Sequence, residues 1–234
     1  MTHPHDTVLI TGAAGHLGRA VAAAFAARGA RCTLLDRNSE ALRQAFGADT
    51  DRQLCLGTDL LDDASVAQAV QTSLTRFGGI GILCHLAGGF RMGEPVHDTS
   101  EQTLELLLDL NLRSLLRVSH HVVPHMLEAG RGRIVTVGAF GAQRGGAQMG
   151  AYAASKSALM RMTESMSAEL KPRGINVNCV LPSIIDTADN RAAMPDADPG
   201  QWVTPAALAD VIVFLGSDAA RAVHGAAIPV TGLV

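Results

Sequence analysis

The chain has 234 residues, 47% of them hydrophobic, and a formal net charge of −3, with acidic and basic residues scattered along it. This length and composition suit one large domain with a buried core, and they exclude intrinsic disorder. With no basic patch, no signal-like start and no apolar run near the roughly 20 residues that cross a bilayer, we expect a cytoplasmic protein without nucleic-acid or membrane partners.

Short apolar runs alternate with helix-like segments along the whole chain. The apolar runs predict buried strands at 8–11, 31–36, 53–57, 80–87, 133–137, 175–181 and 226–230. The segments between them predict helices at 17–28, 39–46, 62–77, 100–127 and 152–170, and Thr204-Pro205 predicts the start of a last helix. This alternation predicts one doubly wound α/β domain over residues 1–234, with a parallel sheet of about seven strands and helices on both faces. Ligands of such sheets bind beyond the carboxyl ends of the strands.

The cysteines and histidines do not form a metal-binding pattern. The four cysteines stand singly in apolar segments, which predicts reduced core thiols. They are Cys32, Cys55, Cys84 and Cys179. His121 and His125 fall one helical turn apart, but Pro124 interrupts the segment and no cysteine or carboxylate pattern accompanies them. We therefore expect no metal site.

The first predicted strand ends in a glycine-rich turn that opens the first predicted helix. The segment 11–18, TGAAGHLG, spaces its glycines as GxxGxxG. Gly12 allows a tight turn, Gly15 lets backbone N–H groups approach a phosphate, and Gly18 lets the helix pack on the strand. The helix start, at His16 and Leu17, offers oriented donors and a partial positive charge to a pyrophosphate. The motif predicts a dinucleotide site, with ordinary turn glycines as the alternative.

Further cofactor contacts are expected where the next strands end. Asp36 ends the second strand, where a carboxylate accepts hydrogen bonds from both ribose hydroxyls and repels a 2′-phosphate; alternatively it caps the next helix. Arg37 could pair with that phosphate, so NAD(H) is preferred and NADP(H) stays open. Asp59 could bond the adenine amino group or stand in an exposed turn. The other expected contacts are Leu60 after the third strand and Ala87, Gly88 and Gly89 after the fourth.

A tyrosine and a lysine stand four residues apart in the segment 152–170. Tyr152 is the only tyrosine of the chain, and Lys156 is one of only two lysines. On a helix this spacing puts both side chains on one face. The ammonium would stabilise a phenolate and lower the pKa of the tyrosine from about 10, which suits proton exchange during hydride transfer. The alternative is a buried tyrosine beside a surface lysine.

Over essentially its whole length the chain resembles the short-chain dehydrogenase/reductase family. Tyr152-Ala-Ala-Ser-Lys156 matches the YxxxK motif of that family, and Asn111-Leu-Arg-Ser114 matches its catalytic asparagine. The resemblance implies a Rossmann-type domain that acts on a small-molecule substrate. It also implies that Lys156 holds the nicotinamide ribose and that Asn111 organises a proton relay to Lys156.

Two further expectations follow from this resemblance. Pro182, Ser183 and Ile185, after the sixth strand, should lie along the nicotinamide. Members of the family commonly pair through two long helices, here 100–127 and 152–170, so we expect a homodimer or homotetramer. These helices carry more apolar residues than one buried face requires, namely Leu104, Leu107, Leu108, Leu115, Leu116, Ala158, Met160, Met162 and Met166.

The chain departs from the family pattern at two places. The family reads NAG after the fourth strand, whereas this chain reads Leu86-Ala-Gly-Gly89. The catalytic serine should lie thirteen residues before the tyrosine, where this chain has Ala139. Alanine at this position, the glycine spacing and the segments 82–90 and 181–205 resemble the dihydropteridine reductases, which implies a quinonoid dihydropteridine as substrate.

Three functions therefore remain open. The first is an NADH-dependent reductase of a small conjugated or carbonyl substrate, with quinonoid dihydropteridine as the first candidate. The second is an ordinary alcohol or 3-oxoacyl reductase in which Gln143, Gln148 or Thr136 replaces the missing serine. The third is a non-catalytic NAD-binding regulator, which the intact Tyr152 and Lys156 argue against.

Overall fold

The computed structural model describes residues 7–234, and their strands form one parallel sheet in the order β3-β2-β1-β4-β5-β6-β7. The strands are β1 (Thr7–Thr11), β2 (Arg31–Asp36), β3 (Gln53–Gly57), β4 (Ile82–His85), β5 (Gly132–Val137), β6 (Ile175–Pro182) and β7 (Ala227–Val230). The strand order reverses between β1 and β4, which pair in parallel. Such a reversal opens a crevice at the carboxyl ends of the two strands. The predicted fold class is confirmed.

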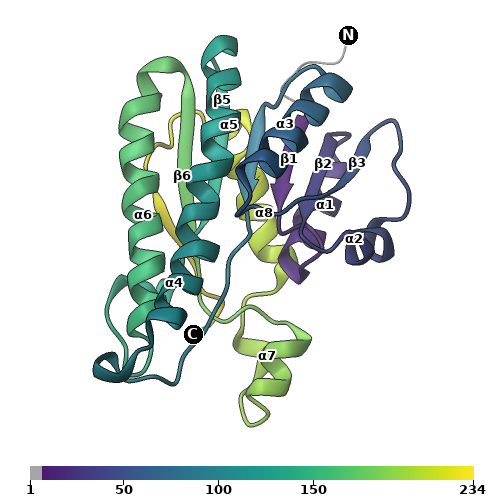
Figure 1. Ribbon diagram of the computed structural model, residues 1–234. Helices are drawn as coiled ribbons and strands as arrows, with labels where there is room; N and C mark the ends of the chain where they lie inside the picture. Colours follow the sequence, from purple (N-terminus) through teal and green to yellow (C-terminus); the bar gives the residue numbers. More distant parts are fainter. Residues whose placement is uncertain (1–6) are drawn as a thin grey trace.

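Helices cover both faces of the sheet (Figure 1). They are α1 (His16–Ala26), α2 (Ser39–Phe46), α3 (Asp63–Phe77), α4 (Glu101–Leu108), α5 (Ser114–Ala129), α6 (Gly150–Leu170), α7 (Ala188–Ala193) and α8 (Pro205–Leu215). α1 and α8 pack together on one face, and α3 and α5 pack together on the other. None of the described helices is long and apolar enough to cross a membrane.

The alternation of side chains along each strand builds two core layers. Val8 and Ile10 face the layer that also holds Phe25 of α1 and Ile212 of α8. Leu9, between them, faces the layer that holds residues of α3 and α5. Successive side chains of a strand point to opposite faces, so a strand covered on both faces must be apolar throughout. Burial on both faces therefore explains why the strands appear in the sequence as short, continuous apolar runs.

The predicted start of the last helix is confirmed, and other helix starts follow the same chemistry. The Thr204 hydroxyl accepts a hydrogen bond from the Ala207 N–H, and Pro205 is the first residue of α8. Asn38 caps α2 by accepting from the N–H groups of Glu40 and Ala41. At these helix starts, a polar side chain thus accepts from N–H groups that have no partner within the helix.

The predicted helix 100–127 is interrupted. A π-helical turn, Asp109–Arg113, separates α4 from α5, and the Ser114 N–H donates to the Asp109 carbonyl five residues before it. The Ser114 hydroxyl instead donates to the Leu110 carbonyl at 2.7 Å. Such π-turns are rare and concentrate at functional sites. The continuous helix was a wrong prediction because the periodicity of the sequence does not record this shift.

Two other predicted boundaries also differ from the structure. The predicted strand 80–87 shrinks to β4, because the N–H groups of Leu86 and Ala87 donate to the Thr11 hydroxyl at 3.1 and 3.2 Å instead of to a neighbouring strand. The segment after β6, for which the sequence predicts no helix, contains α7, which projects beyond the sheet (Figure 1). The four cysteines are free, as expected, and Cys55 alone is only half-buried.

Candidate active site at the carboxyl ends of the strands

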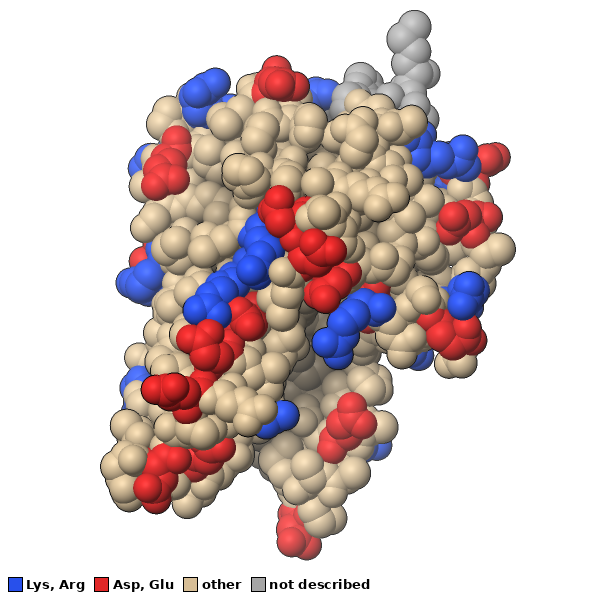
Figure 2. All heavy atoms as spheres, viewed as in Figure 1, with Lys and Arg blue, Asp and Glu red and all other residues tan. Residues whose placement is uncertain are grey.

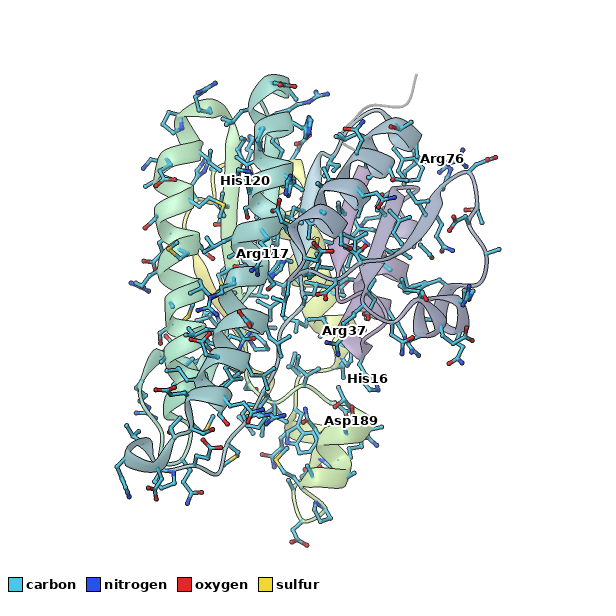
Figure 3. The ribbon with its side chains drawn as sticks, viewed as in Figure 1. His16, Arg37, Arg76, Arg117, His120 and Asp189 are labelled. Atoms are coloured by element: carbon cyan, nitrogen blue, oxygen red, sulfur yellow. The ribbon has the colours of Figure 1, made fainter. Side chains whose placement is uncertain are left out.

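The predicted site residues gather at one end of the sheet. They follow or end β1, β2, β3, β4 and β6, or lie on α6 and in the π-turn. Figure 2 shows the surface hollowed between α7 and the body of the molecule at this end. In Figure 3 His16 and Arg37 border this region, and Asp189 of α7 lies across from them. A separate cavity of about 440 Å³ lies at the opposite end of the sheet, beside Gly81 and Gly132, and therefore away from this chemistry.

The glycine-rich turn requires glycine at two of its three positions. Gly12 has a φ of +66°, and a Cβ there would lie 3.0 Å from the backbone of Ala87. A Cβ on Gly18 would lie 2.3 Å from the Gly12 carbonyl oxygen, so α1 could not pack here with any other residue. Gly15 is exposed and precedes the first residue of α1, His16. The turn leaves the N-terminus of α1 open, so it fits a pyrophosphate.

Asp36 is fixed at the end of β2 by backbone donors. Its carboxylate accepts from the Ala14 N–H and from the Asn38 N–H, both at 3.1 Å. Asn38, and not Asp36, caps α2. The carboxylate is half-buried beside the glycine-rich turn and keeps free lone pairs, so it fits the ribose hydroxyls of a dinucleotide.

Asp59 and Leu60 follow β3 in a turn. The Asp59 carboxylate accepts from the Leu61 N–H at 2.9 Å and is exposed, which matches the turn alternative. Leu60 packs against the core layer of α3 and α5. The structure gives Asp59 a local role, and a contact with adenine stays a prediction.

α6 carries Tyr152 and Lys156 one turn apart, as the spacing predicts. Lys156 is buried, and its Nζ donates to the Val137 carbonyl at 2.8 Å. A Cβ on Gly88 would lie 2.7 Å from Asn111 Oδ1 and 3.1 Å from Lys156 Nζ. The structure therefore brings Lys156, Asn111 and the turn after β4 together, and only glycine fits between them.

Asn111 bonds both the backbone N–H and the backbone carbonyl of Gly89. Its Oδ1 accepts from the Gly89 N–H at 2.9 Å, and its Nδ2 donates to the Gly89 carbonyl and to Ser155 Oγ, both at 3.0 Å. The side chain is fully buried in the π-turn. A buried amide with all of these bonds is a rigid positioning element.

Burial moves the pKa of both catalytic candidates. Desolvation raises the pKa of Tyr152 to about 12 and lowers the pKa of Lys156 to about 8. The prediction that Lys156 pulls the pKa of Tyr152 towards neutrality is wrong for this structure. The Lys156 ammonium donates to Val137, and burial of the phenol penalises its charged form more than any neighbour favours it.

A buried histidine, which the sequence analysis missed, links the glycine-rich turn to the π-turn by hydrogen bonds. His85 Nε2 lies 3.2 Å from Ser114 Oγ, whose proton goes to the Leu110 carbonyl, so the histidine donates here. Its Nδ1 then accepts from the Thr11 hydroxyl at 3.2 Å. Burial, followed by the charge of Lys156, lowers the pKa of His85 to about 3. A polar residue inside the apolar run 80–87 was the available signal.

The position of the missing serine is apolar. Ala139 is buried in a cluster with Ala153 and Leu181, against which Tyr152 packs. Two of the three proposed substitutes point elsewhere: Thr136 Oγ1 lies 2.9 Å from Thr163 Oγ1, and Gln143 Nε2 donates to the Phe140 carbonyl at 3.3 Å. The third, Gln148, is exposed in the turn before α6.

The segment after β6 is held firmly. Pro182 is buried, and the Ser183 hydroxyl donates to the Thr231 carbonyl at 2.7 Å. Ile185 forms a bridge with Val203, and its carbonyl accepts from Asn190 Nδ2 at 2.8 Å. These bonds join α7 to the carboxyl end of β6, where the nicotinamide is expected.

Metal ligands do not gather within residues 7–234. No group of three or more His, Cys, Asp or Glu is placed there to hold an ion. His121, considered above, has a carboxylate partner that the sequence did not reveal: its Nε2 lies 2.9 Å from Asp63 Oδ1.

Comparison with known proteins places this geometry in a family. The family model described as short chain dehydrogenase matches residues 6–198. The chain is 34% identical to D-threitol dehydrogenase of Mycolicibacterium smegmatis, over 96% of this chain and 90% of that protein. It is 32% identical to cis-4-hydroxycyclohexanecarboxylate dehydrogenase of Sinomonas cyclohexanicum, over 96% and 94%. Over 97% of this chain and 96% of the other, it superposes with a TM-score of 0.87 and 27% identity on a 3-ketoacyl-(acyl-carrier-protein) reductase from Brucella melitensis complexed with NADH.

These similarities correct one expectation and support another. The dihydropteridine reductase branch is not supported, because the relatives are dehydrogenases and reductases of polyols, ring alcohols and 3-oxoacyl groups. Solved structures of this fold contain NADH or NADP, so they leave the choice between the two open. The matched family model and the shared length show that this chain belongs to the short-chain dehydrogenase family, whose members are NAD(P)-dependent oxidoreductases.

Proposed function

We propose that this protein interconverts a small secondary alcohol and the corresponding ketone, with NAD(H) as its preferred cofactor. The pair Tyr152 and buried Lys156 on α6, next to Asn111 and Gly88, carries this proposal. An alcohol or 3-oxoacyl substrate replaces the quinonoid dihydropteridine of the sequence analysis because alcohol and 3-oxoacyl enzymes are the relatives.

The residues that would hold the dinucleotide lie at the carboxyl ends of β1, β2 and β6 and on α6. The open start of α1 at Gly15 and His16 suits the pyrophosphate, and the Asp36 carboxylate suits the adenosine ribose. Lys156 and the segment 182–185 would contact the nicotinamide half. The bound cofactor supplies the hydride in reduction and accepts it in oxidation.

The protein's own contribution is a proton and its placement. In reduction the Tyr152 hydroxyl gives its proton to the carbonyl oxygen as the carbon gains the hydride, and in oxidation both steps reverse. Asn111 fixes the turn at Gly89, so the reacting groups stay aligned.

NAD(H) is proposed as the preferred cofactor because of Asp36. Its carboxylate is held by two backbone N–H groups, so it cannot swing away from a 2′-phosphate. Two negative groups in contact cost several kcal/mol. Arg37, exposed beside it, is the residue that would oppose this preference.

Substitution Tyr152→Phe tests the proposal. The variant keeps the ring and its packing but removes the proton donor, so we expect NADH-dependent reduction of a ketone to fall by about 10²–10⁴-fold. NADH affinity, measured by fluorescence titration, should stay within about twofold, which separates loss of chemistry from loss of binding. Activity within about tenfold of wild type would contradict the assignment of Tyr152.

A further inference from the structure

We infer that the substrate carries a flat apolar ring at or beside its reacting carbon, and that Phe90 is the residue that selects it. This inference rests on the alcohol–ketone reaction proposed above and specifies its substrate class.

Phe90 lies directly against the catalytic tyrosine. Its ring packs edge-on against the ring of Tyr152, with 4.8 Å between the centroids and 82° between the planes. Yet 57% of its surface is exposed. A large aromatic side chain in contact with the proton donor, with most of its surface uncovered, offers an apolar ring a place to pack.

The backbone beside Phe90 is held by the catalytic machinery. Asn111 bonds both the N–H and the carbonyl of Gly89, the preceding residue. Further along, the Gly93 N–H donates to the Gln148 carbonyl at 2.9 Å, and Val96 packs against Gly150 at the start of α6. The segment that carries Phe90 is therefore fixed at both ends relative to Tyr152, as a specificity determinant must be.

No hydroxyl stands at position 139, beside the Tyr152 ring. Ala139, where a serine would help to hold the substrate oxygen, is a buried methyl in the cluster that Tyr152 joins. The Thr136 hydroxyl bonds the Thr163 hydroxyl, and the Gln143 amide donates to the Phe140 carbonyl. Without that second anchor on the oxygen, more of the binding free energy must come from the apolar part of the substrate.

Two more apolar side chains stand exposed on the same segments. Met92 follows Phe90 and is 56% exposed, and Phe140 follows Ala139 and is 40% exposed. A polyol needs several placed donors and acceptors, and a site that leaves its hydroxyls unpaired loses affinity. The site therefore favours a ring ketone such as acetophenone over a polyhydroxy ketone such as erythrulose.

The experiment compares these two ketones with wild type, Phe90→Ala and Phe214→Ala. Phe214 is also an exposed phenylalanine, but it lines the cavity at the opposite end of the sheet, so it is the matched control. We expect wild type to prefer acetophenone over erythrulose by at least about tenfold in kcat/KM, because covering the ring of Phe90 contributes about that factor. Phe90→Ala should lower kcat/KM for acetophenone by about tenfold and change that for erythrulose by less than about twofold.

Three outcomes would overturn the inference: erythrulose as the better substrate, turnover of neither ketone, or an equal loss for both ketones in Phe90→Ala. Unchanged NADH affinity and thermal midpoint in Phe90→Ala show that the variant is folded. The Tyr152→Phe variant separates the two proposals. If it is inactive while Phe90→Ala behaves like wild type, the reaction stands and only the ring specificity fails. If it retains full activity, the proposed reaction itself fails.

Discussion

At the scale of single residues, burial works against the charges that the chemistry uses. In the proposed reaction Tyr152 becomes phenolate and Lys156 stays ammonium, but desolvation raises the pKa of Tyr152 to about 12 and lowers that of Lys156 to about 8. A positive charge next to Tyr152 would offset this penalty. The oxidised nicotinamide carries such a charge, whereas the reduced one does not.

The phenol can be titrated directly, because Tyr152 is the only tyrosine of the chain. Ultraviolet difference spectroscopy should give a pKa near 12 for the free protein and a value lower by about one unit or more with saturating NAD⁺. Saturating NADH should shift it less. The Tyr152→Phe variant gives the baseline, and equal pKa values with and without NAD⁺ would remove the electrostatic role assigned here.

Cofactor choice is a second prediction at this scale. Wild type should bind NADH at least about tenfold more tightly than NADPH, since the Asp36 carboxylate, held by two backbone N–H groups, would repel a 2′-phosphate in the proposed binding mode. Asp36→Asn should bring the two affinities close together, while Asp59→Asn, in an exposed turn, should leave the ratio unchanged. Tighter binding of NADPH by wild type would mean that Arg37 governs this end of the cofactor.

Local residue patterns reveal part of this site and conceal the rest. The glycines and the Tyr152–Lys156 pair are visible because their spacing is local. His85 and Phe90 are not, because their importance depends on Ser114 and Tyr152, which the fold brings to them from far along the chain.

At the scale of elements, the site depends on the junction between β4 and the π-turn. His85, at the end of β4, accepts from Thr11 of β1 and donates to Ser114 at the start of α5. Because Nδ1 already accepts a hydrogen bond from Thr11, it cannot carry a second ring proton, so this arrangement holds the neutral imidazole. Strand and helix positions were predictable from periodicity, but the π-turn was not, since Asn111 bonds Ser155 of α6 and Ser114 bonds His85 of β4, both outside its own helix.

His85 should make the protein sensitive to acid. The folded state keeps the ring neutral down to about pH 3, whereas the unfolded chain takes up a proton near pH 6.5. The unfolded state therefore binds more protons in this interval, and the free energy of unfolding falls as the pH drops below 6.5, by up to about 1.4 kcal/mol per pH unit from this group.

Urea unfolding of wild type, His85→Gln and His97→Gln between about pH 7 and 4 measures this contribution. His85→Gln should lose less stability on acidification than wild type, even if it begins less stable. His97 is exposed on a short 3-10 helix before α4, so its substitution should keep the wild-type slope. Parallel slopes for all three proteins would show that His85 is not held neutral.

At the scale of the whole molecule, the alternation of strands and helices predicts a parallel sheet covered on both faces, but it does not predict which residues form the outer surface. Leu107 and Leu115, two of the leucines in excess, are buried inside the chain. Leu104, Leu116 and Met162 remain exposed on α4, α5 and α6, which lie side by side in Figure 1. We propose that these helices pair two copies of the chain.

Light scattering at micromolar concentration should give a mass near two or four times the 24.4 kDa of one chain. Leu116→Glu should shift this mass towards a single chain, because a charge in an apolar interface loses its hydration without gaining a partner. Phe214→Glu, on α8 across the sheet, serves as the comparison. A wild-type mass of one chain would refute pairing through these helices.

Lys156, finally, limits how far this enzyme can be changed. Its ammonium is buried against the Val137 carbonyl, and burial lowers its pKa to about 8. Below that pH the folded chain carries a buried charge that is better solvated in the unfolded chain, which lowers the free energy of unfolding. A protein destabilised by such a buried charge tolerates fewer further destabilising substitutions before it stops folding. Directed evolution at Phe90 should therefore yield more functional variants when libraries are expressed and screened with saturating cofactor, which binds only the folded state and widens the tolerated range.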